Sequence, residues 1–161
     1  MTIKVGDRLP EATFMTMSAD GPKPMKTGEI FSGKKVALFA VPGAYTGTCS
    51  KLHLPSYVSN FDELKKKGFD MVACTSTNDI FVLSAWGKEH KADGKVTMLA
   101  DGSAEFVKKV GLDLDLSARG MGTRSKRYAM VVDNGVVKAL NVEDQPGVVE
   151  KTGGDTMCKL G

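Results

Sequence analysis

A short apolar run that ends in a tight polar turn limits the architectures open to this chain. The run, residues 36–40, reads Val-Ala-Leu-Phe-Ala, which is typical of a strand buried on both faces. The turn that follows contains Pro42, Gly43 and Gly47, and an amphipathic stretch begins at Ser50. We therefore expect a strand, a tight turn and then a helix in direct succession.

Cys49 lies at the end of this turn, where a thiol is readily ionised. A helix N-terminus carries unpaired N–H groups and about half a positive charge, which favour the thiolate, the nucleophilic form of cysteine. The alternative is a small buried hydrophobic residue, as many intracellular cysteines are. Thr46 adds a nearby hydroxyl, and Thr48 is a candidate helix cap. The pattern predicts a small polar pocket with a thiol at its floor.

Strands and helices alternate along the rest of the chain. Further strands are predicted over 69–75, 96–100, 128–133 and 136–141, and helical patterns over 50–67, 79–90 and 103–110. Asn134-Gly135, between two β-rich runs, predicts a hairpin with a type I′ turn. This order predicts an α/β fold with parallel central strands and an antiparallel edge. Ligands of such sheets bind beyond the C-terminal strand ends, which is where Cys49 is expected.

The remaining segments and helix boundaries give weaker signals. Residues 16–34 are expected to form a loop, and 147–160 to hold a short helix weakened by two glycines. In 50–67 a kink is expected at Pro55, and Asn78-Asp79 and Ser103 are the candidate caps of the next two helices. The apolar face of 50–67 is expected to consist of Leu52, Tyr57, Phe61 and Leu64.

Composition excludes several classes of protein. A chain of 161 residues suits one domain, residues 1–161, with an ordinary 42% of hydrophobic and 25% of charged residues. Its apolar stretches are far shorter than the ~20 residues of a membrane helix. The basic run 65–67 lacks interleaved aromatic residues, so no nucleic-acid partner is expected. No signal pattern is seen at the N-terminus, so we expect a cytoplasmic protein, or an organellar one, for example mitochondrial, if a targeting segment was removed.

The cysteines argue against a disulfide scaffold or a zinc site. Cys49, Cys74 and Cys158 are an odd number at unrelated spacings, and no Cys-x-x-Cys pair occurs. This usage fits a reducing compartment.

The residues around Cys49 resemble a motif of a known family. Pro42-x-x-x-Thr46-x-x-Cys49 resembles the active-site motif of the peroxiredoxins, and 41–55 is similar to their type-five subclass, which includes the plant type II enzymes. The similarity extends through 74–79, 85–87, 99–101 and 124–133 and ends near 138–143. It implies a thioredoxin-like fold, with a central mixed sheet flanked by helices and an N-terminal extension.

The resemblance also implies roles for individual residues. Cys49 resembles the peroxidatic cysteine, Thr46 the hydroxyl that hydrogen-bonds substrate and thiolate, and Pro42 the residue that shields the thiolate from water. Arg127 resembles the guanidinium beside the thiolate, and its place before the strand at 128 favours it over Arg124. One departure is Gly47, where many relatives carry proline.

The implied activity is thiol-dependent reduction of hydrogen peroxide and alkyl hydroperoxides, an antioxidant role that passes through a sulfenic acid on Cys49. No metal or organic cofactor is expected, and a homodimer is the expectation of the subclass. Recycling is expected from an external thiol, either glutathione with glutaredoxin or thioredoxin. Cys158 as a resolving cysteine is an alternative, whereas Cys74 is expected to be a buried core residue.

Other functions compete with this interpretation. A redox sensor would use the same Cys49 to oxidise a partner protein, and a holdase-like chaperone would survive Cys49→Ser. His53, one turn after Cys49, raises the idea of a Cys–His hydrolase, but no partner acid is evident. His53 is expected instead to be a hydrogen-bonding residue, and Trp86 to lie in the core or the pocket wall.

Overall fold

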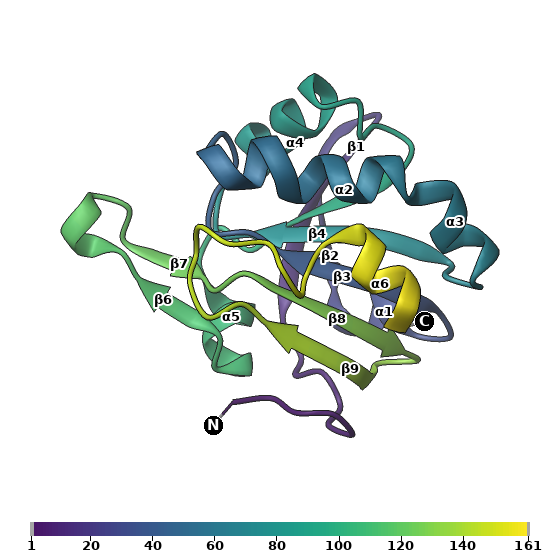
Figure 1. Ribbon diagram of the computed structural model, residues 1–161. Coiled ribbons are helices and arrows are strands. Elements are labelled where there is room, and N and C mark those ends of the chain that lie inside the picture. The colour runs from purple at the N-terminus through teal and green to yellow at the C-terminus, as the bar shows by residue number, and fades with distance from the viewer. Residues whose placement is uncertain (1, 161) are drawn as a thin grey trace.

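A seven-stranded mixed sheet forms the centre of the computed structural model, which describes residues 2–160. From edge to edge its strands are β2 (Gly21–Lys26), β1 (Thr13–Ser18), β5 (Val96–Ala100), β4 (Met71–Ser76), β3 (Lys35–Ala40), β8 (Tyr128–Asp133) and β9 (Val136–Val142). β5, β4 and β3 are parallel, and every other pairing is antiparallel (Figure 1). The α/β fold with a mixed sheet and parallel central strands is therefore confirmed.

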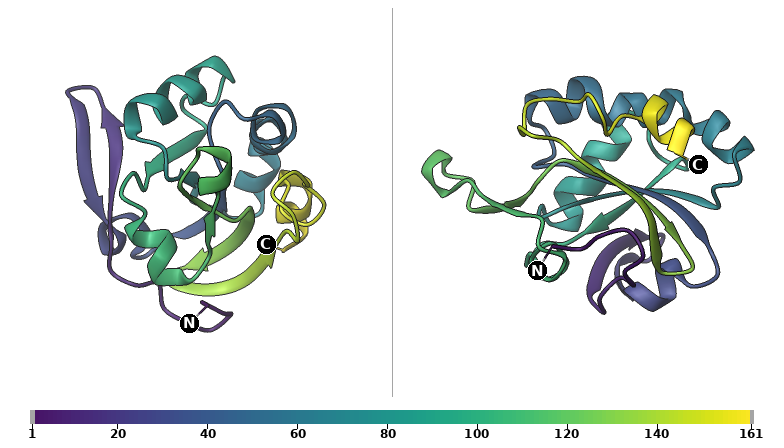
Figure 2. Two further views of the ribbon diagram at one scale, coloured as in Figure 1. Left: turned by 90° about the vertical axis from the view of Figure 1, so that its left-hand side faces the viewer. Right: turned by 60° about the horizontal axis from the view of Figure 1, so that its bottom comes forward.

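Alternate residues of the strands supply an apolar core on each face of the sheet. In β3, Ala37 and Phe39 pack on one face, and Val36, Leu38 and Ala40 on the other, as the two-residue period of a strand requires. Each face is then covered by helices (Figure 2). Those of the first face are α2 (Leu54–Ser59), α3 (Phe61–Lys66), α4 (Ile80–Glu89) and α6 (Gly154–Leu160), and those of the second are α1 (Thr27–Phe31) and α5 (Glu105–Val110).

The prediction of a loop over 16–34 is wrong. This segment completes β1, forms β2 and continues into α1. Pro22 and Pro24 lie inside β2, where they pair with Met17 and Met15 of β1. Proline is tolerated there because β2 is an edge strand and its outer side donates no hydrogen bonds to the sheet. The β1–β2 hairpin is the N-terminal extension that the resemblance implied.

The helix predicted over 50–67 is broken into three pieces. It begins as a π-helix, η1 (Cys49–His53), in which Leu54 N–H donates to the Cys49 carbonyl, and Pro55 lies in the first turn of α2. A second break falls at Asn60, before α3. Leu52, predicted to be on the apolar face, is instead 57% exposed. The wider π turn changes the angular spacing of side chains, which a constant helical period misses.

The other boundary signals give mixed outcomes. The Asp79 carboxylate caps α4 by accepting from Val82 N at 2.9 Å, and the Asn134-Gly135 hairpin forms with positive φ at both residues. The short C-terminal helix is also confirmed, as α6. The predicted cap at Ser103 is wrong, because the Asp101 carboxylate accepts from the first N–H groups of α5.

A two-stranded arm that the sequence did not predict projects from the body (Figure 1). It consists of β6 (Asp113–Asp115), the short helix η2 (Ser117–Arg119) and β7 (Thr123–Ser125). Within residues 2–160, the helices are all too short or too polar to cross a membrane.

Candidate active site

Strand ends bring the candidate site together. β8 runs antiparallel to β3, so Tyr128 pairs with Ala40 at the point where β3 ends. Arg127, which precedes Tyr128, therefore stands beside the turn that leads from β3 to Cys49. The sheet topology thus joins two groups that are 78 residues apart in the chain.

A buried cation contacts the cysteine sulfur. Cys49 is fully buried, and Arg127 is 2% exposed. Arg127 Nη2 donates to Cys49 Sγ at 3.0 Å, and its Nε and Nη2 donate to the Pro146 carbonyl at 3.0 and 2.8 Å. An arginine guanidinium keeps its charge at any physiological pH, so a permanent positive charge lies against the Cys49 sulfur.

His53 orients the guanidinium from the other side. Its Nε2 lies 2.9 Å from the Thr152 carbonyl, which can only accept, so Nε2 carries the proton. Nδ1 is then an acceptor, and it receives Arg127 Nη1 at 2.8 Å. Burial, and then the Arg127 charge, lower the pKa of His53 to about 3. The imidazole is therefore neutral at neutral pH, and its acceptor nitrogen is occupied by Arg127 rather than facing the thiol as a hydrolase base.

The turn before Cys49 is held by its own hydrogen bonds. Thr46 Oγ1 donates to the Gly43 carbonyl at 2.7 Å. Arg124 Nη1 donates to the Pro42 carbonyl at 3.3 Å, so this arginine braces the turn while Arg127 contacts the sulfur. A Cβ at Gly43 would lie 2.9 Å from Arg124 Nη1, so a larger residue there would require the Arg124 side chain to shift.

Thr48 and Trp86, two neighbouring side chains, form hydrogen bonds that the sequence did not predict. Thr48 is not a helix cap: its own backbone is helical, and its Oγ1 donates to the Gly147 carbonyl at 3.0 Å. Trp86 is fully buried, as expected, and its Nε1 donates to Ser50 Oγ at 2.9 Å. This bond ties α4 to the first turn of η1.

A cavity of about 240 Å³ gives access to the guanidinium. Its apolar walls include Pro42, Leu116 and Met121, and its polar groups include Thr46 and Arg127. It is large enough for a small hydroperoxide.

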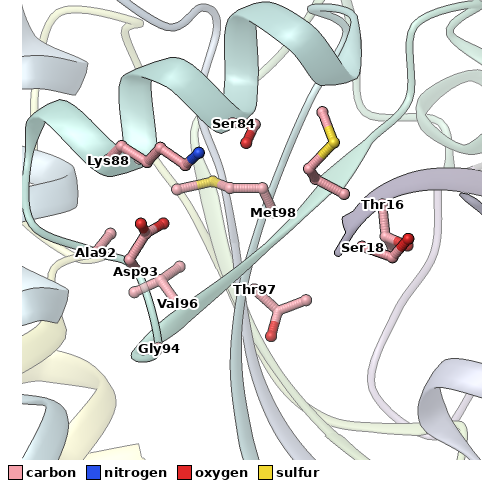
Figure 3. A pocket seen from close by; sticks show the side chains of 12 residues that line it. Thr16, Ser18, Ser84, Lys88, Ala92, Asp93, Gly94, Val96, Thr97 and Met98 are labelled. Atoms are coloured by element: carbon pink, nitrogen blue, oxygen red, sulfur yellow. The ribbon is translucent and has the colours of Figure 1, made fainter. Parts of the chain in front are cut away.

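A separate hollow of about 360 Å³ lies between α4, β1 and β5 (Figure 3). Thr16, Ser84, Lys88 and Asp93 are among its lining residues, which include no cysteine and none of the predicted site residues. These lining residues include no thiol, so we do not assign the thiol chemistry to this hollow.

The other two cysteines are also free thiols in buried positions. Burial raises the pKa of Cys74, in β4, and proximity to Cys49 raises it further. Burial, followed by the charge of Glu63, also raises the pKa of Cys158, in α6. Both environments therefore favour the protonated thiol, which is the weaker nucleophile.

One part of the site has no signal in the sequence. The segment 144–153, which we call the strap, runs from β9 across the site to α6 (Figure 1). Its carbonyls at Pro146 and Thr152 receive Arg127 and His53, and the Thr152 carbonyl also accepts Tyr57 Oη at 2.7 Å. Every residue type has a backbone carbonyl, so no residue pattern reveals these contacts.

Comparison with known proteins finds one matching family and several similar relatives. It matches the Redoxin family over residues 4–156. It is 43% identical over 163 residues to Peroxiredoxin-2E, chloroplastic, of Arabidopsis thaliana, with 99% of this chain and 70% of that protein covered. It is 44% identical over 143 residues to Peroxiredoxin-2D of the same plant, with 88% of each covered.

Solved structures show the same similarity. Reduced Prx3 from Vibrio vulnificus, crystallised in complex with hydrogen peroxide, is 46% identical, with a TM-score of 0.93 and coverage of 99% of this chain and 100% of that one. Peroxiredoxin 5 from Alvinella pompejana is 33% identical, with a TM-score of 0.85 and coverage of 98% and 97%.

Proposed function

Because the chain belongs to the plant type II peroxiredoxins of the Redoxin family, and is therefore an antioxidant thiol-dependent peroxidase, we propose that Cys49 is its peroxidatic residue. In this proposal Arg127, Thr46 and Pro42 complete the site. The observation that carries it is the 3.0 Å contact between Arg127 Nη2 and Cys49 Sγ. A fully buried thiol held against a permanent cation is suited to nucleophilic attack.

In the proposed reaction the Cys49 thiolate attacks one oxygen of the hydroperoxide in line with the O–O bond. The S–O bond forms as the O–O bond breaks, and sulfur supplies the electron pair. The departing oxygen leaves as hydroxide or alkoxide and takes up a proton, which gives water or an alcohol and a cysteine sulfenic acid. Negative charge develops on the departing oxygen, and Arg127 is the donor placed to stabilise it.

Thr46 and Pro42 prepare the substrate side of the site. Thr46 donates its only hydroxyl proton to the Gly43 carbonyl. Its oxygen is then left to accept the O–H of the hydroperoxide, which orients the O–O bond. Pro42 lines the cavity and displaces water from the sulfur.

The size of the cavity favours hydrogen peroxide and small alkyl hydroperoxides as substrates. The similar Vibrio vulnificus Prx3 was crystallised with hydrogen peroxide, which supports the same substrate for this chain.

An external thiol is the proposed reductant. It attacks the sulfenic sulfur, releases water and forms a mixed disulfide, and a second thiol then frees Cys49. The raised pKa values of Cys74 and Cys158 support this route, because neither thiol is readily ionised to resolve the sulfenic acid internally. Glutathione with glutaredoxin, or thioredoxin, is the proposed source.

A homodimer is part of the proposal. Large apolar side chains stay exposed close to the site: Tyr45 by 51%, Leu52 by 57% and Phe81 by 64%. Ala44 N donates to Asn78 Oδ1 at 2.8 Å, which holds the turn with Tyr45 against the segment that leads into α4 and Phe81. A second copy would cover these residues, and light scattering of Phe81→Glu, which should be monomeric, tests it.

The proposed compartment is reducing, such as the cytoplasm, because all three cysteines are free thiols. Relatives carry chloroplastic and mitochondrial names, so family membership does not by itself fix the location. Imaging of a tagged full-length protein in its source cells tests the proposal.

Intact-mass spectrometry after one equivalent of hydrogen peroxide, with a dimedone-type trap, tests the chemistry. We expect an adduct on Cys49 in the wild type, in Cys158→Ser and in Cys74→Ser. Loss of two hydrogens in the wild type, replaced by an adduct in one serine variant, would identify that cysteine as the resolving residue. No rapid oxidation at Cys49 would refute the proposed peroxidatic role.

A further inference from the structure

A buried carboxylate outside the proposed reaction ties down the strap. Glu143 follows β9 and is only 6% exposed. Its Oε2 accepts hydrogen bonds from the backbone N–H groups of Glu150, Lys151 and Thr152 at 2.8, 2.7 and 3.0 Å, and from Thr152 Oγ1 at 2.8 Å. Glu143 Oε2 therefore fixes the conformation of residues 150–152, at the C-terminal end of the strap.

The backbone of Glu143 is anchored next to Arg127. Val142 pairs with Tyr128, and Glu143 N then donates to the Arg127 carbonyl at 2.9 Å. Glu143 thus contacts the sheet through its backbone at the position of Arg127 and contacts the strap through its side chain.

The strap in turn holds both groups that align Cys49. The Thr152 carbonyl accepts from His53 Nε2, and the Pro146 carbonyl accepts twice from Arg127. Thr152 therefore donates to Glu143 from its N–H and its hydroxyl, while its carbonyl accepts from His53. The path from Glu143 to Sγ runs through Thr152, His53 and Arg127.

The second carboxylate oxygen points to a role beyond stability. Among residues 2–160, Glu143 Oε1 is buried without a hydrogen-bond partner. Such an oxygen is unfavourable for folding. The buried Glu143 carboxylate therefore lowers the stability of the fold. It does so at a position whose other contacts set the geometry of the site.

We infer that Glu143 is a positioning residue of the peroxidase reaction, whose carboxylate holds the strap so that Arg127 and His53 stay aligned on Cys49. This inference rests on the proposed role of Cys49. Nothing in the residue pattern around position 143 marks it as part of the site.

The first test compares two reactions of Cys49 in Glu143→Gln. Oxidation by hydrogen peroxide depends on aligned donors, whereas alkylation by iodoacetamide depends on thiolate and on access to the buried sulfur. Displacing a catalytic group by 1 Å can slow a reaction by about 10²-fold, and a partly retained strap should give about tenfold slower oxidation. Asp144→Asn is the matched control, because it removes the adjacent carboxylate, which is 88% exposed and pairs with the partly exposed Lys151 ammonium at 3.4 Å; such a surface ion pair contributes little, so the rate should stay unchanged.

A fall in oxidation of more than threefold without faster alkylation supports the inference. A fall of threefold or less, or any fall accompanied by faster alkylation, overturns it, because faster alkylation means general loosening. Glu143→Asp, which keeps the charge but shortens the reach, is the second variant should Glu143→Gln fail to fold, and the same criteria apply.

The second test asks whether Glu143 acts through Arg127. In an Arg127→Gln background, Glu143→Gln should slow oxidation by less than twofold, since the group that it positions is already gone. A further loss as large as in the wild-type background would overturn the inference. The wild type separates the two proposals: if its Cys49 is not oxidised, the proposed function fails first, and if it is oxidised, the variants decide the role of Glu143.

Discussion

Acidification is expected to destabilise the protein through His53. This imidazole is fully buried, donates from Nε2 to Thr152 and accepts from Arg127 on Nδ1. A proton on Nδ1 would place a second positive charge against the Arg127 guanidinium and would remove the acceptor. Burial and that charge lower the pKa of His53 from 6.5 to about 3.

The sign and size follow from proton linkage. Because the folded-state pKa is lowered, the unfolded chain takes up the proton first as the pH falls. The stabilisation is therefore complete above about pH 6.5 and is lost as the pH falls towards 3. One proton changes the unfolding free energy by about 1.4 kcal/mol per pH unit, so about 2 kcal/mol should be lost between pH 7 and pH 5. That is a sizeable part of the roughly 5–15 kcal/mol that stabilises a typical domain.

Urea unfolding at about pH 7, 6 and 5 measures this loss in the wild type and in His53→Gln. Glutamine keeps a donor for Thr152 and an acceptor for Arg127 but does not titrate. Burial raises the pKa of Asp101, which acts in the opposite direction, but Asp101 is present in both proteins and its effect cancels. We expect the wild type to lose about 2 kcal/mol more than the variant over this range. Equal losses in the two proteins would refute the assignment of a neutral, Arg127-bound His53.

Three further substitutions test other contacts. In Arg127→Lys the charge is kept, but lysine has no fork of donors to contact both Cys49 and the Pro146 carbonyl. Hydrogen peroxide should therefore oxidise Cys49 about 10²-fold more slowly. Stopped-flow fluorescence measures this rate, and a rate within threefold of wild type would contradict the prediction. Thr46→Val removes the hydroxyl at constant shape and should slow the same oxidation by about 10²-fold, because the hydroperoxide loses the acceptor that orients it, while iodoacetamide alkylation changes much less; equal effects on both reactions would argue against substrate orientation. Gly154→Ala would drive a Cβ into the Ser56 carbonyl, so we expect a loss of about 1–3 kcal/mol as a lower Tm, and an unchanged Tm would argue against this close approach of α6 to α2.

Structural elements that depend on residues close together in the chain were predicted well. The apolar run of β3 and the Asn134-Gly135 turn place strands correctly, because burial on both faces and positive φ leave direct marks on residue type. β2 escaped prediction because its prolines argue against a strand, and only its place at the sheet edge makes them acceptable. The π turn of η1 was not predicted because a constant helical period does not allow for a wider turn.

The sequence by itself determined the turn of the site: Pro42, Thr46 and Cys49 lie within one strand-to-helix connection, so local chain geometry brings them together. Its resemblance to a family singled out Arg127 over Arg124. Only the tertiary structure decided what surrounds Arg127. Antiparallel pairing of β8 with β3 brings the guanidinium to the sulfur, and strap carbonyls with neutral His53 hold it there. Those partners are backbone oxygens and a histidine tautomer, which residue type does not encode and which form only when distant segments pack together.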